Sequence, residues 1–246
     1  SGTDAYNGVT GDTINLIDNL VGVLVQATVD DVWFNDAVLV TGDAQIMADQ
    51  RDVNFVSTLD SAVAVNGDVE VFALNGMADF NDNVGANLAL LKLTVNAKDT
   101  FFDGVGTLTA GSVNIGTGGL EVYGDQGTTT LNGNVISAGN VLINDTVVLT
   151  NNVTIDTATP ATPDANVEIT GTVNADDVLN LWDFTINAGT GNVTLRDSVG
   201  NDEAVRDFTV LSTGQTILNN NIVASRDILL GGATNIDLDS DVCNCS

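Results

Sequence analysis

Short apolar triplets recur along most of this chain, and each is bounded by Gly, Asn, Asp or Thr. The triplets at 113–115, 120–122 and 141–143 read VNI, LEV and VLI. Such a triplet places two apolar side chains on one side of a strand, because successive side chains point to opposite sides. A strand of three residues cannot bury a core alone. The pattern therefore predicts many short strands stacked on one another in a solenoid.

Comparable triplets predict strands along nearly the whole chain, with no helix of useful length. The predicted strands lie at 23–25, 32–34, 38–40, 53–55, 63–65, 69–71, 91–93, 113–115, 120–122, 141–143, 147–149, 153–155, 167–169, 184–186, 193–195, 208–210, 228–230 and 236–238. Turn-forming residues separate them throughout. We therefore interpret the chain as one elongated, repetitive unit.

Two spacings predict the length of one coil. Four apolar positions follow one another at equal intervals; they are Val69, Leu91, Val113 and Val135. Residues 127–143 also align without gaps on residues 214–230, and the offset between these two segments is close to four such intervals. Both spacings predict coils of about 20–25 residues, the length of one turn of a three-sided β-helix.

Hairpins of an antiparallel fold are the alternative, because Asn-Gly at 66–67 and at 75–76 is a strong signal for a two-residue hairpin turn. The very short triplets, the coil-length repeats and the Asn-rich turns favour the parallel arrangement. In successive coils Asn side chains can stack as hydrogen-bonded ladders. The predicted fold class is all-β, a right-handed parallel β-helix.

The chain divides into three predicted parts. Residues 1–20 form a leading segment or N-terminal cap, which could instead pair with a neighbouring subunit. Residues 21–242 form the solenoid, interrupted near 156–166 by a loop that contains both prolines. Residues 243–246 form a tail with both cysteines. The chain begins with Ser rather than Met, which we interpret as removal of a signal peptide or as a piece of a longer protein.

Charge narrows the range of partners. The net charge is −27, from 33 acidic residues and only six Lys or Arg. Nucleic acids and anionic membrane surfaces attract basic proteins, so both are poor partners for this chain. Hydrophobic residues make up 43% of the chain, mostly Val, Ile, Leu and Ala, while aromatic residues make up 5%. This composition suits thin, repeated layers, and no apolar run is long enough for a membrane helix.

Four segments resemble the degenerate repeats of large bacterial adhesins of the filamentous-haemagglutinin type. These segments are LTVNA at 93–97, TTTLNGNVISAGNVLI at 128–143, VVLTNNVTIDT at 147–157 and FTINAGTGNVTL at 184–195. The resemblance covers about residues 90–240. It implies a right-handed parallel β-helix, export through the outer membrane, and a role in adhesion or in extracellular fibres.

The residue types argue against an enzyme. The chain contains no His, which excludes Ser-His-Asp and Cys-His catalysis and His-ligated zinc. A carbohydrate-cleaving β-helix would need a tuned pair of carboxylates, for which Asp30-Asp31 and Asp176-Asp177 are the candidates by composition. Binding of a glycan would also need aromatic platforms, and Trp33, Tyr123 and Trp182 are few and dispersed in the sequence.

The predicted fold requires no cofactor, and calcium is the candidate for one. Asp237, Asp239 and Asp241 alternate in the sequence and could present three carboxylates on one side of the last strand. Calcium takes six to eight oxygen ligands, so neighbouring coils would have to contribute. Cys243 and Cys245 could bind a soft metal, form a local ring or, as we rank first, form disulfides between subunits. A disulfide role indicates an oxidising compartment.

The predicted function is structural. A secreted β-solenoid of this kind would be the subunit of an extracellular filament or a surface adhesin, with other copies of itself and cell-surface glycans as partners. The open ends of a β-helix expose unpaired backbone groups and an apolar cross-section, which favours end-to-end assembly. The alternatives are a calcium-dependent surface-layer component and a β-helix that binds or cleaves carbohydrate.

Overall fold

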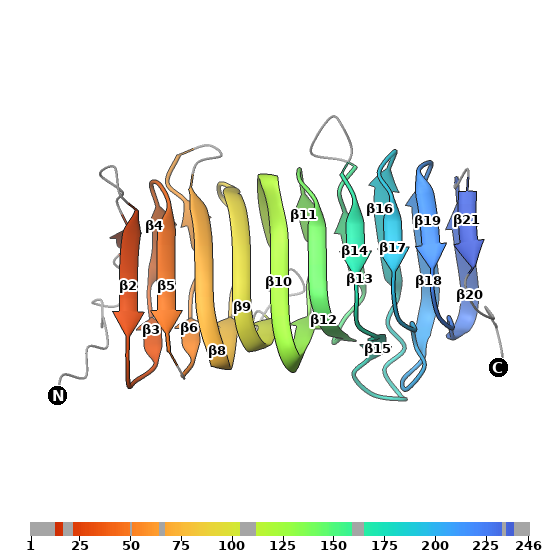
Figure 1. Cartoon of the computed structure of the whole chain (residues 1–246), viewed down its shortest axis with the longest axis horizontal. Coiled ribbons are helices and arrows are strands. Elements are labelled where there is room, and N and C mark those ends of the chain that lie inside the picture. The colour runs from red at the N-terminus through yellow and green to blue at the C-terminus, as the bar shows by residue number, and fades with distance from the viewer. Residues whose placement is uncertain are drawn as a thin grey trace.

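A computed structural model describes residues 13–16, 22–49, 51–63, 67–103, 112–158, 165–232 and 235–238. Within these residues the chain forms strands and turns but no helix. Every pairing between its named strands is parallel, and the strands stack along one long axis (Figure 1). The predicted parallel β-solenoid is confirmed. The antiparallel alternative is wrong, because Asn75 and Gly76 lie within a continuous strand rather than in a hairpin turn.

The coils have three sides, here named faces A, B and C. Face A contains β2 (Val23–Ala27), β5 (Ala44–Ala48), β14 (Val167–Ile169), β17 (Val193–Leu195), β19 (Gln215–Leu218) and β21 (Asn235–Leu238). Face B contains β3 (Val32–Phe34), β6 (Val53–Phe55) and β15 (Val173–Ala175), and single bridges at Val199 and Ile222 continue it. Both faces also receive parts of longer strands.

Face C contains β1 (Thr13–Leu16), β4 (Ala37–Val40), β7 (Leu59–Ser61), β11 (Val135–Ser137), β13 (Val153–Asp156), β16 (Phe184–Gly189), β18 (Val205–Ser212) and β20 (Ala224–Gly231). Four long strands bend around corners without interruption. Of these, β8 (Asp68–Phe80), β9 (Leu90–Phe102) and β12 (Val141–Leu149) serve faces A and B, whereas β10 (Val113–Leu131) serves all three.

The coils vary in length, which corrects the predicted spacing. Along face A the registered step from Leu93 to Leu120 is longer than the step from Thr216 to Ile236. The predicted step from Val113 to Val135 is a true registered pair. The predicted step from Val69 to Leu91 is wrong, because Val69 pairs with Leu93.

The internal duplication does not correspond to a whole number of coils. Leu131 pairs with Leu149 on face B. Leu218, its counterpart in the alignment, pairs with Leu195 on face A. The two aligned segments therefore share their order of strands and turns but occupy different faces. Triplets on all three faces have the same composition, so sequence similarity alone does not distinguish one face from another.

The core is a set of apolar columns that run along the axis. Inward-facing side chains stack on their counterparts in the next coil, and the longest aromatic column lies on face B. Phe34, Phe55, Phe80 and Phe102 are each at most 2% exposed. Successive rings in this column lie 5.0, 4.9 and 4.9 Å apart and within 15° of parallel. Stacked rings of this kind contribute beyond the apolar area that they bury.

Some predicted elements differ from the observed ones on face C. The predicted strand at 63–65 does not form at Val63, which is exposed in a bend, while Ala64 and Val65 lie outside the described residues. The strand of this coil is β7 instead. Its central residue, Asp60, is only 1% exposed and accepts hydrogen bonds from the backbone N–H and the side chain of Asn87 at 3.0 and 2.9 Å. Ser61, whose hydroxyl donates to the Val63 carbonyl at 2.5 Å, stands in place of the second apolar residue of the triplet, which explains why the sequence did not predict β7.

Phe102→Ala should destabilise the protein by about 3–5 kcal/mol, because it removes a fully buried ring from the aromatic column. The neighbouring Phe101 lies on the outward side of the same strand and is only partly buried, so Phe101→Ala is a matched control with a smaller expected loss. Urea unfolding followed by circular dichroism measures both. Equal losses would contradict the stacked core.

Candidate functional site: the two ends of the coil stack

Backbone hydrogen bonds between coils have a fixed direction in this fold. Inward-facing residues donate their N–H groups to the coil that follows. Val23, Val32 and Val38, for example, donate to the carbonyls of Asp43, Asp52 and Thr58, at 2.8–2.9 Å. The same relation holds far along the chain, where Val167 donates to Asn192 at 2.9 Å.

Outward-facing residues bond in the opposite direction, to the coil that precedes them. The N–H groups of Val56, Asn81, Thr170 and Arg196 donate to the carbonyls of Phe34, Phe55, Ile143 and Ile169, at 2.9–3.0 Å. In a parallel strand the N–H and C=O of one residue point to the same side and those of the next residue to the other. Each coil therefore presents two chemically different edges.

Asp and Asn side chains at the corners add a second set of contacts between coils. A side-chain oxygen of one coil accepts the backbone N–H of the next coil in contacts of 2.8–3.2 Å. The acceptor and donor pairs include Asp31 and Asp52, Asp43 and Asp68, Asp99 and Thr128, Asn152 and Asp183, and Asp207 and Asp227. The longest series runs from Asn140 through Asn166 and Asn192 to Gln215, at 3.0, 2.8 and 2.8 Å. Asn residues therefore do repeat at the corners of successive coils, but their side chains bond to the backbone of the next coil rather than to one another.

The N-terminal end of the stack has an unpaired edge within the described residues. There β1, β2 and β3 pair only with the following coil, through β4, β5 and β6. The inward residues Val23, Val25 and Ala27 are only half-buried. Their counterparts one coil later, Ala44, Ile46 and Ala48, are at most 3% exposed. This difference in exposure shows how much solvent access a preceding coil removes from the inward-facing side chains.

The C-terminal end shows the same incompleteness. Within the described residues β20 pairs only with β18, and β21 only with β19. The inward residues Ile228 and Leu230 are half-buried, whereas their partners Phe208 and Val210 are at most 1% exposed. Among the described strands no pairing joins the first coil to the last, and the two ends of the stack lie at opposite extremes of the long axis (Figure 1).

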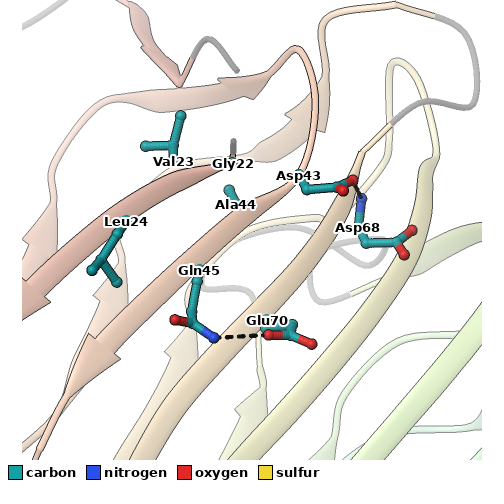
Figure 2. A pocket seen from close by; sticks show the side chains of 8 residues that line it. All are labelled: Gly22, Val23, Leu24, Asp43, Ala44, Gln45, Asp68 and Glu70. Atoms are coloured by element: carbon teal, nitrogen blue, oxygen red, sulfur yellow. Dashed lines mark hydrogen bonds between the residues drawn. The ribbon is translucent and has the colours of Figure 1, made fainter. Parts of the chain in front are cut away.

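A surface depression of about 540 Å³ adjoins the N-terminal edge. Its lining comes from β2, β5, the start of β8 and the residues just before β2 and β5, and it includes the acidic residues Asp43, Asp68 and Glu70. Figure 2 shows the Gln45 side-chain amide donating to Glu70, at 2.9 Å, and the Asp68 backbone N–H donating to Asp43. Burial, followed by repulsion from Asp43, raises the pKa of Asp68. The depression is therefore acidic, and the exposed Leu24 forms part of its lining.

The sequence-predicted calcium ligands are only partly within the described residues. Asp237 lies in β21, where it pairs in register with Ile217, while Asp239 and Asp241 lie outside the described residues. Among the described residues no group of three or more acidic or other metal-ligating side chains is arranged to hold a metal ion. Cys243 and Cys245 also lie outside the described residues. Calcium binding at 237–241 and the intersubunit disulfides remain predictions.

The two acidic dipeptides have local structural contacts. Asp31 accepts the backbone N–H of Asp52 at 3.2 Å. Asp176 accepts hydrogen bonds from the indole N–H of Trp182 at 2.7 Å and from Asn180 at 3.3 Å, and Asp177 accepts the backbone N–H of Leu179 at 2.8 Å.

The structure does not gather the three aromatic residues considered for a glycan platform. Trp33 lies on face B, and Tyr123 lies on face A. Trp182 follows β15 in the excursion that leads to β16. A platform of stacked aromatic rings therefore does not form from these residues. The predicted glycan partner stays untested.

One buried carboxylate, which no sequence pattern marks, has a raised pKa. Asp145 lies at the corner between faces A and B and is 7% exposed. Burial raises the pKa of Asp145 from 3.8 to about 6, against hydrogen bonds from the Thr129 hydroxyl at 3.0 Å and the Thr146 N–H at 2.8 Å. Gly124 makes room for this carboxyl, because a Cβ there would lie 2.3 Å from its carbon.

Comparisons with known proteins leave the fold without a named family. No protein-family model, no curated protein and no solved structure matches the chain. The β-solenoid architecture stands on the structure alone, and the resemblance to filamentous-haemagglutinin-type adhesins remains a hypothesis about function. In the described part of the chain no helix has the length and apolar character to cross a membrane.

Asp145→Asn should flatten part of the pH dependence of stability. Because the pKa of Asp145 is higher in the folded state than its ordinary value of 3.8, the folded state favours the protonated form. Its favourable contribution is complete below about pH 4 and is lost as the pH rises through about 6. Two pKa units correspond to roughly 3 kcal/mol.

Denaturant unfolding at pH 4, 5, 6 and 7 measures this effect. Asp30→Asn removes the same charge from an exposed position and serves as the control. Wild type and Asp30→Asn should lose stability between pH 4 and pH 6 more steeply than Asp145→Asn. Parallel curves for all three proteins would contradict the assigned role of Asp145.

Proposed function

We propose that this protein is a structural subunit that assembles end to end into an extracellular filament or a surface adhesin. The observation that carries the proposal is the pair of open ends, where apolar side chains that are fully buried in inner coils are only half-buried. Unpaired strand edges with partly exposed apolar residues are templates for another chain. In a solenoid each coil gains stability from its neighbours, so a second copy supplies what the terminal coils lack.

The charge on the sides of the solenoid disfavours contact between the sides of two copies, which leaves the ends for assembly. Four of the six basic side chains form ion pairs between neighbouring coils; these pairs are Lys92 with Glu121, Arg196 with Glu168, Arg206 with Asp183 and Arg226 with Asp207. With a net charge of −27, the sides of two copies repel one another. The ends combine partly exposed apolar residues with unpaired backbone groups, and the attraction between them does not depend on charge.

The proposal that the protein lies outside the cell rests on its sequence. The resemblance of residues 90–240 to exported adhesins supports secretion, and Cys243 and Cys245 would link subunits covalently in an oxidising environment. A solenoid with acidic, self-repelling sides would stay soluble along its length while it extends at its ends. Adhesion would then be a property of the sides of the filament and growth a property of its ends.

The purified protein should form unbranched fibres of constant width whose mean length grows with protein concentration. Added salt should promote growth, because it screens the repulsion between copies. Electron microscopy and light scattering over a wide concentration range measure both effects. Monomers at every concentration and salt level would refute the proposed function, and fibres that require added calcium would favour the calcium-dependent surface layer.

A further inference from the structure

We infer that the joint between copies has a single polarity: the C-terminal coil of one copy stacks on the N-terminal coil of the next. This inference rests on the proposed function and specifies its partner as a second copy of this chain in one orientation. It follows from the direction of the hydrogen bonds between coils, which makes the two ends chemically different.

At the N-terminal end the open backbone groups belong to outward-facing residues. Val23 donates its N–H to Asp43 in the following coil at 2.9 Å. Backbone groups alternate along a strand, so those of Leu24 and Gln26 point away from the stack, toward the position of a preceding coil. Both side chains are exposed, which leaves this edge accessible.

At the C-terminal end the open backbone groups belong to inward-facing residues. Within the stack, an inward residue bonds to the coil that follows it, as Val153 does to Asp183 at 2.9 Å. Ile228 and Leu230 are the inward residues of β20, and β20 pairs only with the preceding β18 among the described residues. Their backbone groups therefore point along the axis toward the position of a following coil.

The corner side chains give the same polarity. In the contacts described above, the side-chain oxygen belongs to the earlier coil and the N–H to the later one. Asp227 is the last acceptor position of its series, with its side chain 78% exposed and a 3.6 Å contact to Arg226. The C-terminal end thus offers an acceptor toward a following coil at this corner.

Stacking the C-terminal coil on the N-terminal coil of another copy reproduces the interior pattern. In this register Ile228 of face C lies opposite Ile14, and Ile236 of face A lies opposite Val23. The backbone groups of inward-facing residues in one copy then face the backbone groups of outward-facing residues in the other. The same relation holds between any two inner coils. Two N-terminal ends, or two C-terminal ends, would instead meet with antiparallel strands and without the corner contacts.

The substitution Leu24→Pro tests this polarity. Leu24→Pro removes an N–H that points away from the stack, and an edge strand tolerates proline where its N–H faces solvent. Leu24→Ala shortens the same exposed side chain but keeps the N–H, so it is the matched control. Every joint of the inferred polarity needs one intact N-terminal edge. Leu24→Pro alone should therefore be monomeric in analytical ultracentrifugation, while Leu24→Ala should form fibres like wild type.

Other outcomes distinguish a failure of the inferred polarity from a failure of the proposed function. Discrete dimers of Leu24→Pro would show that C-terminal ends pair with each other, which overturns the polarity but leaves end-to-end assembly. Full-length fibres of Leu24→Pro would overturn the inferred joint. Wild type that never assembles would refute the proposed function itself. Gln26→Pro, with Gln26→Ala as its control, repeats the test on the same edge if Leu24→Pro unfolds, as judged by circular dichroism.

Discussion

The coil-to-coil backbone ladder is the interaction on which the rest of this structure depends. It fixes which residue lies above which, and so it stacks Phe55 on Phe34 and Phe80 on Phe55. Each strand is too short to be stable alone, and its backbone groups are satisfied only by the coils on either side. Because the ladder has a direction, every coil has one edge that faces forward and one that faces back.

The acidic composition follows from the same ladder. Asp and Asn have short side chains whose oxygens reach the backbone N–H of the next coil at a corner, as Asp43 does for Asp68 and Asn166 for Asn192. Many carboxylates thus serve the fold while they charge the surface. The cost is burial, which raises the pKa values of Asp79, Asp103 and Asp145, and repulsion from other carboxylates adds to the rise at Asp79 and Asp145. In the proposed filament this charge would keep the sides of two copies apart and leave the ends as the place of contact.

The alternation of side chains made the solenoid predictable, because triplets such as 141–143 and 193–195 have the same two-residue period in sequence and structure. The phase of the coils was not predictable. Successive coils differ in length, and strands on different faces have similar composition, so equal spacing predicts Leu91 as the partner of Val69, whereas the structure pairs Val69 with Leu93. Open ends were predicted as a property of the fold class. The chemical difference between the two edges could not be predicted from the sequence, because it depends on the direction of each hydrogen bond between coils.

Residue-resolved hydrogen exchange on the monomer tests the ladder most directly. At the N-terminal edge, the account predicts slow exchange for the amides of Val23, Val25 and Val32, which point into the stack, and fast exchange for those of Leu24, Gln26 and Trp33, which point away from it. In inner coils, inward and outward residues should both be protected. Equal protection of neighbouring amides along β2 and β3 would contradict an open, directional edge.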